Sequence, residues 1–279
     1  MRPLSATARG VGLRPELVAP LCDQPRRRDI DFLEIAPENW LGIGGRKRDQ
    51  LDRLADLYPL VAHGLSLSIA DPRQLNRDFL ADVRRFLDDY GIALYSDHLS
   101  LSRDETGYLY DLLPVPRRAS NLDYLADRID QVQDATGRRL VLENISYYHG
   151  FPDQMPEAEF VSALVERSGC GLLLDINNAY VNAHNHHEDA LAFVTALPSD
   201  AIVYYHIAGH LELEDGTLLD THGTPVADAV TALGRAVWQH HGARPLLLER
   251  DNFVPSLDEL AEEVAAVQAA MAEPAHALA

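Results

Sequence analysis

Short apolar runs recur along the chain at fairly even spacing, and nearly all of them stop at a polar side chain. Between them lie longer segments in which apolar residues recur every three or four positions. This alternation predicts parallel strands joined by crossover helices. The strand candidates are residues 31–35, 60–69, 92–99, 140–144, 172–176, 202–207, 218–220 and 245–249.

The amphipathic segments between these runs have recognisable helix ends. Several are followed by a glycine (Gly91, Gly137, Gly169 or Gly242), the residue that most readily ends a helix. The last one begins near residue 256 and runs into an alanine-rich C-terminal tail that is expected to fray. The expected helices therefore cover residues 74–90, 121–136, 157–168, 225–241 and the segment from about 256.

The spacing of the runs indicates the fold class. Most runs are about thirty residues apart, which is the length of one strand–helix unit in a barrel of roughly 250 residues. We therefore predict an α/β fold, a (β/α)8 TIM barrel, as a single domain over residues 1–279 with its core from about 10 to 272. Residues 100–118 do not alternate and contain Pro114 and Pro116, so we expect a loop at the mouth of the barrel.

Composition fits this prediction and excludes several classes of protein. Hydrophobic residues make up 47% of the 279 residues, enough for a full core, and no run approaches the length of a membrane span. The net charge of −19 repels polyanions, so we expect no nucleic-acid partner and no membrane association. The two cysteines, Cys22 and Cys170, do not suggest a disulfide, which indicates a reduced, cytoplasmic protein.

The polar residues that end the runs indicate a metal site. Side chains at the C-terminal ends of barrel strands converge on one mouth. Imidazoles and carboxylates without thiolates suit iron, manganese, zinc or nickel. A single acidic residue at a strand end more often caps the helix that follows. Helix capping alone would have to account for all of these residues at the same end of the barrel, which favours a shared metal site instead. The candidate ligands are His63, His98, Glu143, Asp175, His206, Asp220 with His222, and Glu249, with the amide of Asn178 three residues beyond Asp175.

Longer sequence motifs around these residues carry a family resemblance. They include GVGLR, DFLEIAPENW, HGLSLS, SDHLS, LLPVP, LENISYY, LLLDINNAY, IAGH, DTHGTPV and LLERD. Together they resemble the multinuclear non-haem iron-dependent oxidative enzymes, which have xylose-isomerase-like TIM barrels. The resemblance runs from about Gly10 to Pro255. The order of ligands is also similar to that of endonuclease IV, but Asn178 stands where that enzyme has a histidine, and the acidic charge does not suit DNA.

The resemblance implies three metal positions. His63, His98 and Glu143 would hold a first iron, with Glu143 bridging to the second. Asp175, His206 and Glu249 would complete the second position, and these six residues are the catalytic candidates. Asn178, Asp220 and His222 would hold a third ion.

Other residues are candidates for orienting these ligands or contacting a substrate. His186 matches a family position, but His187 replaces the glycine that usually follows it. The full set is Glu34, Asn39, Asn144, Asn177, His186, His210, Arg250 and Asp251.

The resemblance implies a function as well. It implies two or three mixed-valent iron ions, and O2 as co-substrate, in the modification of a ribosomally synthesised precursor peptide. The target would most often be a cysteine, with oxazolone, thiooxazole-type or related products, and a partner protein would recognise the peptide. Two alternatives stay open: a divalent-metal phosphodiesterase or sugar isomerase on the same barrel, and a non-catalytic metal-storage or peptide-carrier protein. Metal identity, oxygen dependence and turnover distinguish these functions.

Overall fold

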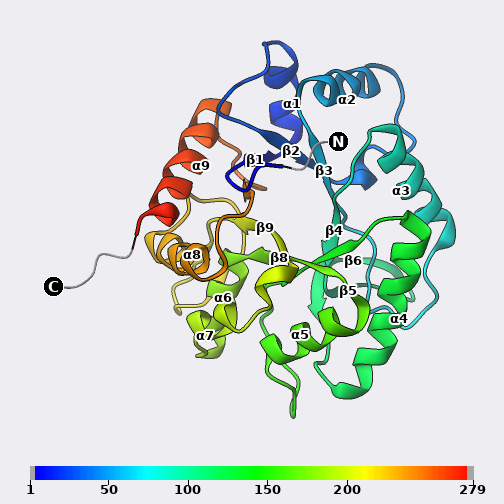
Figure 1. Ribbon diagram of the computed structural model, residues 1–279, viewed down its shortest axis with the longest axis vertical. Coiled ribbons are helices and arrows are strands. Elements are labelled where there is room, and N and C mark those ends of the chain that lie inside the picture. Colours follow the sequence, from blue (N-terminus) through cyan, green and yellow to red (C-terminus); the bar gives the residue numbers. More distant parts are fainter. Residues whose placement is uncertain (1–3, 275–279) are drawn as a thin grey trace.

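The computed structural model describes residues 4–274, and these form a closed barrel of eight parallel strands with helices outside it (Figure 1). Around the barrel the strands follow the order β1, β12, β9, β8, β7, β4, β3, β2. Every neighbouring pair is parallel, so the predicted TIM barrel is confirmed. The strands are β1 (Arg9–Gly12), β2 (Phe32–Ile35), β3 (Leu60–His63), β4 (Tyr95–His98), β7 (Leu140–Glu143), β8 (Gly171–Asp175), β9 (Ile202–Ile207) and β12 (Leu246–Leu248).

The sequence signals for helix ends operate as expected in the outer layer. Gly137 and Gly169 end their helices with left-handed backbone conformations, and Ser256 forms a reciprocal capping box with Glu259. The predicted helices correspond to α3 (Arg77–Asp89), α4 (Ala119–Thr136), α5 (Glu157–Ser168), α8 (Asp228–His241) and α9 (Leu257–Ala272). The outer layer also contains α1 (Pro15–Cys22), α2 (Gly45–Leu57), α6 (Ile176–His186) and α7 (Ala190–Thr195), with single 3-10 turns at Pro37–Asn39 and Ser199–Ala201.

One predicted strand was wrong, and the structure has another in its place. Residues 218–220 do not join the barrel: β11 (Leu218–Leu219) pairs with β10 (Leu211–Glu212) in a separate antiparallel ribbon. The eighth barrel strand is instead β1, which closes the barrel between β12 and β2. Its sequence, RGVG, is too short and too rich in glycine to stand out as an apolar run. Gly10 has a packing reason, because a Cβ there would lie 2.4 Å from the ring of Phe32.

The predicted mouth loop at residues 100–118 also needs correction. Most of it is a β-hairpin formed by β5 (Ser100–Asp104) and β6 (Gly107–Pro114). The register of this pair shifts between Leu101 and Arg103, so β6 contributes extra residues to the ribbon. The two prolines lie at and beyond the end of β6, where they do not interrupt the pairing.

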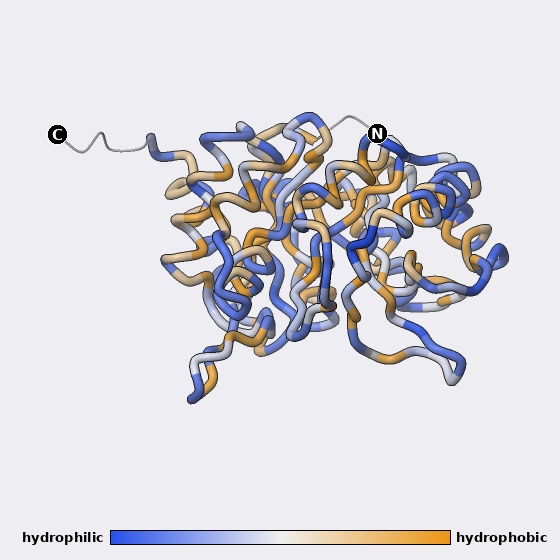
Figure 2. The backbone as a smooth tube through the Cα atoms, turned by 90° about the horizontal axis from the view of Figure 1, so that it is seen from below, coloured by the Kyte–Doolittle hydropathy of each residue, from blue (hydrophilic) through white to orange (hydrophobic). Residues whose placement is uncertain are grey.

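Side chains that point into the barrel form an apolar layer with a polar layer above it. The apolar layer contains Phe32, Val61, Val141, Leu173, Tyr204 and Leu247. Because side chains alternate along a strand, the next inward position is two residues later. Those positions are Glu34, His63, Glu143, Asp175, His206 and Glu249, all of them buried. Figure 2 shows the hydrophobic segments concentrated inside the molecule, with hydrophilic tips on the two loops that project from one side.

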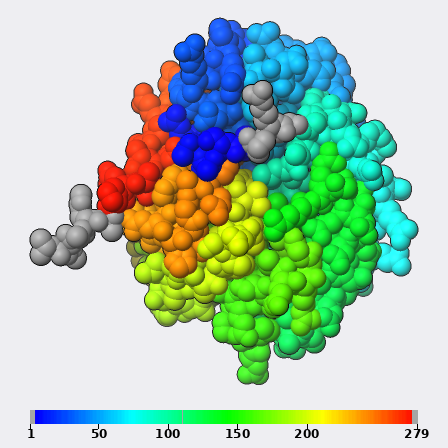
Figure 3. Space-filling model, viewed as in Figure 1, coloured from blue at the N-terminus to red at the C-terminus, as the bar shows by residue number. Residues whose placement is uncertain are grey.

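The C-terminal helix α9 lies beside the N-terminal segment, where Gln268 donates to the carbonyl of Thr7 at 3.2 Å. In Figure 3 the C-terminal helix, drawn in red, packs beside the N-terminal segment. The predicted alanine-rich tail lies largely beyond residue 274, outside the described residues. Across residues 4–274, none of the helices combines the length and the apolar character that crossing a bilayer requires. Cys22 and Cys170 are buried and unpaired.

Candidate metal centre

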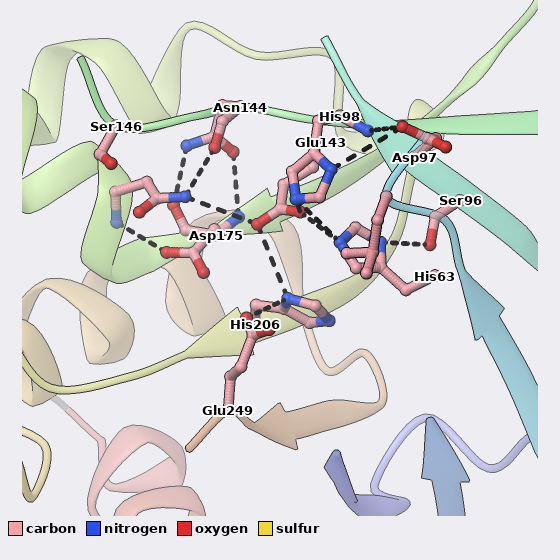
Figure 4. A network of polar contacts seen from close by, with 12 residues as sticks. His63, Ser96, Asp97, His98, Glu143, Asn144, Ser146, Asp175, His206 and Glu249 are labelled. Atoms are coloured by element: carbon pink, nitrogen blue, oxygen red, sulfur yellow. Dashed lines mark hydrogen bonds and ion pairs between the residues drawn. The ribbon is translucent and has the colours of Figure 1, made fainter. Parts of the chain in front are cut away.

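The strand ends of the barrel bring histidines and carboxylates into one cluster (Figure 4). Three groups of possible metal ligands have donor atoms within 4.8 Å of one another, and adjacent groups share a carboxylate. Glu143 belongs to the first and second groups, and Glu249 to the second and third. The groups are His63, His98 and Glu143; then Glu143, Asp175, His206 and Glu249; then His222, Glu249 and Asp251.

The first group comes from three strands that lie side by side, β3, β4 and β7. The Nε2 atoms of His63 and His98 are 3.1 Å apart. The Oε2 atom of Glu143 lies 3.0 Å from the first and 3.4 Å from the second. Two imidazole nitrogens and one carboxylate oxygen therefore converge on a single point, as the ligands of a bound cation do.

The second group is centred on His206 of β9. Its Nδ1 atom lies 3.6 Å from Oε1 of Glu143 and 3.1 Å from Oε2 of Glu249. Oδ1 of Asp175 caps α6 by accepting from the backbone N–H of Asn178 at 2.6 Å. Oδ2 of the same carboxylate has no hydrogen-bond partner among the described residues, so it is available to bind a metal ion. The helix-capping role considered from the sequence and the ligand role are therefore compatible.

The third group differs from the set that the resemblance implied. Nδ1 of His222 lies 3.5 Å from Glu249 and 3.3 Å from Asp251, and its Nε2 lies 2.6 Å from Asp220. Asp251, expected only as a supporting residue, therefore sits among the possible ligands. His222 adopts a left-handed backbone with φ of 47°, uncommon for a residue other than glycine and typical of functional sites.

Electrostatics in the cluster follow from burial and from the close packing of opposite charges. Burial favours the neutral acid, but the facing imidazoles of His63, His206 and His98 outweigh it and hold the pKa of Glu143 below its ordinary value. For Asp175, burial and the nearby carboxylates of Glu143 and Asp220 act together and raise the pKa to about 8. Burial opposes charging of His63, but Glu143 outweighs it and raises the pKa of this histidine to about 9.

Unpartnered acceptors in the cluster fit a bound cation. Oδ2 of Asp175 and Oδ1 of Asn178 are buried and accept no hydrogen bond from any residue that the structure describes. Buried acceptors without donors are costly, and most proteins avoid them. A metal ion supplies the missing positive partner. The oxygen and nitrogen donors of the cluster suit iron, manganese, zinc or nickel.

A chain of buried hydroxyl groups orients two of the candidate ligands, and neither of its central residues was predicted from the sequence. Tyr204 donates to Oε2 of Glu34 at 2.8 Å, and the same oxygen accepts from Nε2 of His206 at 3.1 Å. The hydroxyl of Ser96 lies 2.7 Å from the Tyr204 hydroxyl and 3.2 Å from the Ala62 carbonyl, so an acceptor is available for its proton. The Ser96 oxygen in turn accepts from Nδ1 of His63 at 2.9 Å. Both imidazoles therefore turn their remaining nitrogen toward the cluster.

Asparagine side chains hold Asp175 of the second group, and Asp220 beside the third group, in place. Asn144 pairs with the backbone of Asp175, accepting from its N–H and donating to its carbonyl, both at 2.9 Å. Asn177 donates to Oδ1 of Asp220 at 2.7 Å and accepts from Nδ1 of His210 at 2.8 Å. Ser146, which the sequence pattern did not single out, donates to the other oxygen of Asp220 at 2.9 Å.

Two candidate residues are not brought to the cluster. His186 stacks on Tyr147 and bonds to its backbone carbonyl at 2.9 Å. Arg250 is buried and donates to Glu263 of α9 at 2.5 Å. Asn39 lines the cavity above the ligands, and its backbone carbonyl accepts from Lys47 at 2.9 Å.

A cavity of about 740 Å³ opens above the ligand groups, within the range of small-molecule and peptide sites. Its lining includes the carboxylates of Glu34, Asp111, Glu143, Asp220, Glu249 and Asp251. Among the described residues that line it, Arg14 is the single Lys or Arg, and it donates to Glu249 at 3.1 Å and also pairs with Asp251. Arg14 was missed because it follows β1, the strand that the hydrophobic pattern did not reveal.

Comparisons with known proteins agree with this site. A model of the RiPP precursor modification enzyme family MbnB/TglH/ChrH, where RiPP denotes a ribosomally synthesised and post-translationally modified peptide, matches residues 8–272. The UPF0276 protein of Acinetobacter baylyi is 46% identical over 259 residues, covering 93% of this chain and 89% of its own.

Solved structures show the same fold at much lower identity. A xylose isomerase-like TIM barrel protein from Mycobacterium smegmatis, in complex with magnesium, has a TM-score of 0.60 at 16% identity, covering 96% of this chain and 98% of its own. Endonuclease IV from Thermus thermophilus has a TM-score of 0.61 at 18% identity, covering 95% and 98%. These similarities confirm a xylose-isomerase-like barrel. Because the family model spans nearly the whole barrel, the chain belongs to the RiPP precursor modification enzymes of the MbnB/TglH/ChrH family, the multinuclear non-haem iron-dependent oxidative enzymes.

Proposed function

We propose that this protein uses iron and O2 to oxidise a ribosomally made precursor peptide, most often at a cysteine. The observation that carries the proposal is the sharing of Glu143 and Glu249 between adjacent ligand groups beneath an open cavity. A bridging carboxylate holds two ions close together, which suits a reaction that draws electrons from more than one metal. Membership of a family of precursor modification enzymes supports a peptide as the substrate.

The assignment of ligands follows the three groups. His63, His98 and Glu143 would hold one ion, and Asp175, His206 and Glu249, with Glu143 as the bridge, a second. His222 would hold a third ion with Glu249 and the nearby Asp251, Asp220 or Asn178. When bound, the iron ions supply the one-electron and O2 chemistry that no side chain of the cluster provides.

The side chains of the protein contribute geometry and shielding to the proposed reaction. Ser96 and Glu34 fix the imidazoles of His63 and His206, so each presents one nitrogen to its ion. Ser146 and Asn177 hold the carboxylate of Asp220 in the same way. The cavity above the groups admits an extended peptide segment, and the barrel wall keeps water from the lower side of the ligands.

The proposal assigns this activity to a single barrel domain acting in the cytoplasm, where Cys22 and Cys170 stay reduced. It includes a partner protein that delivers the precursor peptide. The barrel and its short loops occupy nearly all of the described chain, which leaves little of it for a separate peptide-recognition domain.

The proposal is tested by co-expression with a cysteine-containing peptide encoded beside the gene, with and without a neighbouring partner gene. Mass spectrometry should detect an oxygen-dependent mass change at a cysteine, and only when iron is supplied. The change should disappear in Asp220→Ala and persist in Asp215→Ala, a matched control in which an exposed aspartate of the β10–β11 turn is removed. Modification that proceeds without O2, or equally well with zinc replacing iron, would refute the iron–oxygen assignment. Full modification without the partner would refute the need for one.

A further inference from the structure

Exposed apolar side chains gather around the mouth that contains the metal centre. Leu65 follows β3, Tyr148 and Phe151 follow β7, and Tyr108 lies in the β5–β6 hairpin. Leu211 and Leu213 belong to the β10–β11 ribbon, and Phe253 follows β12. All of these segments continue from C-terminal strand ends. Exposed apolar groups concentrated on one functional face mark a binding surface.

Phe253 is the most exposed of these side chains, at 89% of its surface. Its backbone adopts a left-handed conformation with φ of 49°, and its ring lies against Gly223, where a Cβ would come within 3.3 Å of it. The neighbouring Asn252 lines the cavity and donates to the carbonyl of Thr221 at 2.8 Å. The loop of Phe253 is therefore joined to the loop of His222, and Asn252, the residue before Phe253, lines the cavity above the metal centre.

The β5–β6 hairpin stands on the other side of the mouth. In the order of strands around the barrel, β4, which precedes the hairpin, is four positions from β12, which precedes Phe253. In a ring of eight strands this separation places the two segments opposite each other. The irregular register of the hairpin directs Asp111 and Leu112 to the cavity. Asp111 is exposed and forms no ion pair with any residue that the structure describes.

The charge of the cavity restricts which molecules can bind between the β5–β6 hairpin and the loop of Phe253. Five of the six carboxylates that line the cavity face the metal centre, and Arg14, the one Lys or Arg among the described residues there, is paired with Glu249 and Asp251. Asp111 is the lining carboxylate that is left for a basic side chain of the occupant. A basic side chain would be attracted to Asp111 and an acidic one repelled, and the net charge of −19 acts in the same direction.

We infer that the precursor peptide binds as an extended segment between the β5–β6 hairpin and the loop of Phe253. The side chain of Phe253 packs on an apolar residue next to the residue to be modified, and Asp111 pairs with a basic side chain of the same segment. The inference rests on the proposed function, in which a precursor peptide is the substrate. It specifies the residues that the enzyme selects beside the cysteine to be modified, namely an apolar residue and a basic residue.

Binding of defined peptides tests this inference without turnover. Two short fluorescent peptides carry a central cysteine beside a phenylalanine and differ only in having lysines or glutamates at the remaining charged positions. Their affinity for the purified, metal-containing protein is measured by fluorescence anisotropy in the absence of O2. The lysine peptide should bind more tightly by about tenfold or more at low salt, and added salt should reduce the difference.

Single-residue variants of the protein test which side chains contact the peptides. Phe253→Ala should weaken binding of both peptides by about tenfold, whereas Leu191→Ala, which removes an exposed apolar side chain on α7, should change nothing. Asp111→Lys should shift preference toward the glutamate peptide, whereas Asp49→Lys, the same charge change on α2, should not.

The outcomes separate this inference from the proposed chemistry. Equal affinity for the two peptides, or wild-type binding by Phe253→Ala, would overturn the docking surface. Selective binding followed by no reaction with O2 would instead count against the iron–oxygen chemistry and leave the surface intact.

Discussion

Glu143 and His63 face each other across 3.0 Å, from Oε2 to Nε2, on strands that are separated by β4 in the barrel. The other oxygen of the same carboxylate lies 3.6 Å from Nδ1 of His206. One buried carboxylate therefore faces two ligand groups at once. Its position at the middle of the cluster makes it the residue whose loss should disturb more than one ion.

Glu143→Gln should lose metal from both the first and the second group. The amide keeps the shape of the side chain but removes the negative charge that faces His63 and His206. Elemental analysis of protein purified without O2 should show metal per chain falling to less than half of the wild-type content. Glu157→Gln is the matched control, because Glu157 is a poorly exposed carboxylate paired with Arg117 on the outer layer. Undiminished metal in Glu143→Gln would exclude the bridging role.

Tyr204→Phe should lower metal affinity without removing any ligand. The variant loses the hydroxyl that donates to Glu34, which in turn accepts from His206. Support groups of this kind change metal affinity by about tenfold or more when they are removed. Chelator competition measures the effect. Tyr205→Phe, the next residue on β9, provides the control, since its hydroxyl donates to the backbone of Gly242 on the outer side. Equal affinities in the two variants would contradict the proposed orientation of His206.

Metal binding should release protons. In the metal-free protein the pKa of Asp175 is raised to about 8 by burial and by Glu143 and Asp220. The pKa of His63 is about 9, because Glu143 outweighs the effect of burial. Both pKa values lie above 7, so both groups carry a proton at pH 7 that a cation must displace. Affinity should therefore rise as the pH is raised from 7 through 9.

Titration with Co2+ in weak buffer containing an indicator dye measures this release. Asp175→Asn has no proton to lose at that position, so it should release fewer protons at pH 7 than the wild type does. An unchanged proton count in this variant, or an affinity that falls as pH rises through this range, would show that Asp175 and His63 are not both ligands.

The clustering of the candidate ligands was largely predictable from the sequence, because barrel strands have a strict inward and outward alternation. His63, Glu143 and His206 each end a short apolar run, and the fold places all such ends on one face. The supporting residues were not predictable in the same way. Tyr204 and Ser96 have the pattern of ordinary core positions, and their hydrogen bonds exist only once the barrel is closed.

Errors in the predicted strands had specific physical causes. β1 has two glycines in four residues, so hydrophobicity does not mark it, and Arg14 beyond it was overlooked. Asp220 was expected at the end of a barrel strand, but it follows β11 of the separate ribbon and is held at the site by Ser146 and Asn177. His186 and Arg250 were expected near the ligands, but each has its hydrogen-bond partner elsewhere, at the Tyr147 carbonyl and at Glu263.

The protein should not bind duplex or abasic DNA at physiological salt, although endonuclease IV shares its barrel. The net charge is −19, and Arg14, the single Lys or Arg among the described residues that line the cavity, is already paired with Glu249 and Asp251. DNA affinity comes mainly from Lys and Arg neutralising phosphates, and the described residues that line this cavity offer no unpaired Lys or Arg for that role. Fluorescence anisotropy with an abasic duplex should give no binding at micromolar protein, and no strand cleavage should follow when iron, zinc or manganese is added. Salt-sensitive submicromolar binding with cleavage would instead favour the phosphodiesterase function over peptide oxidation.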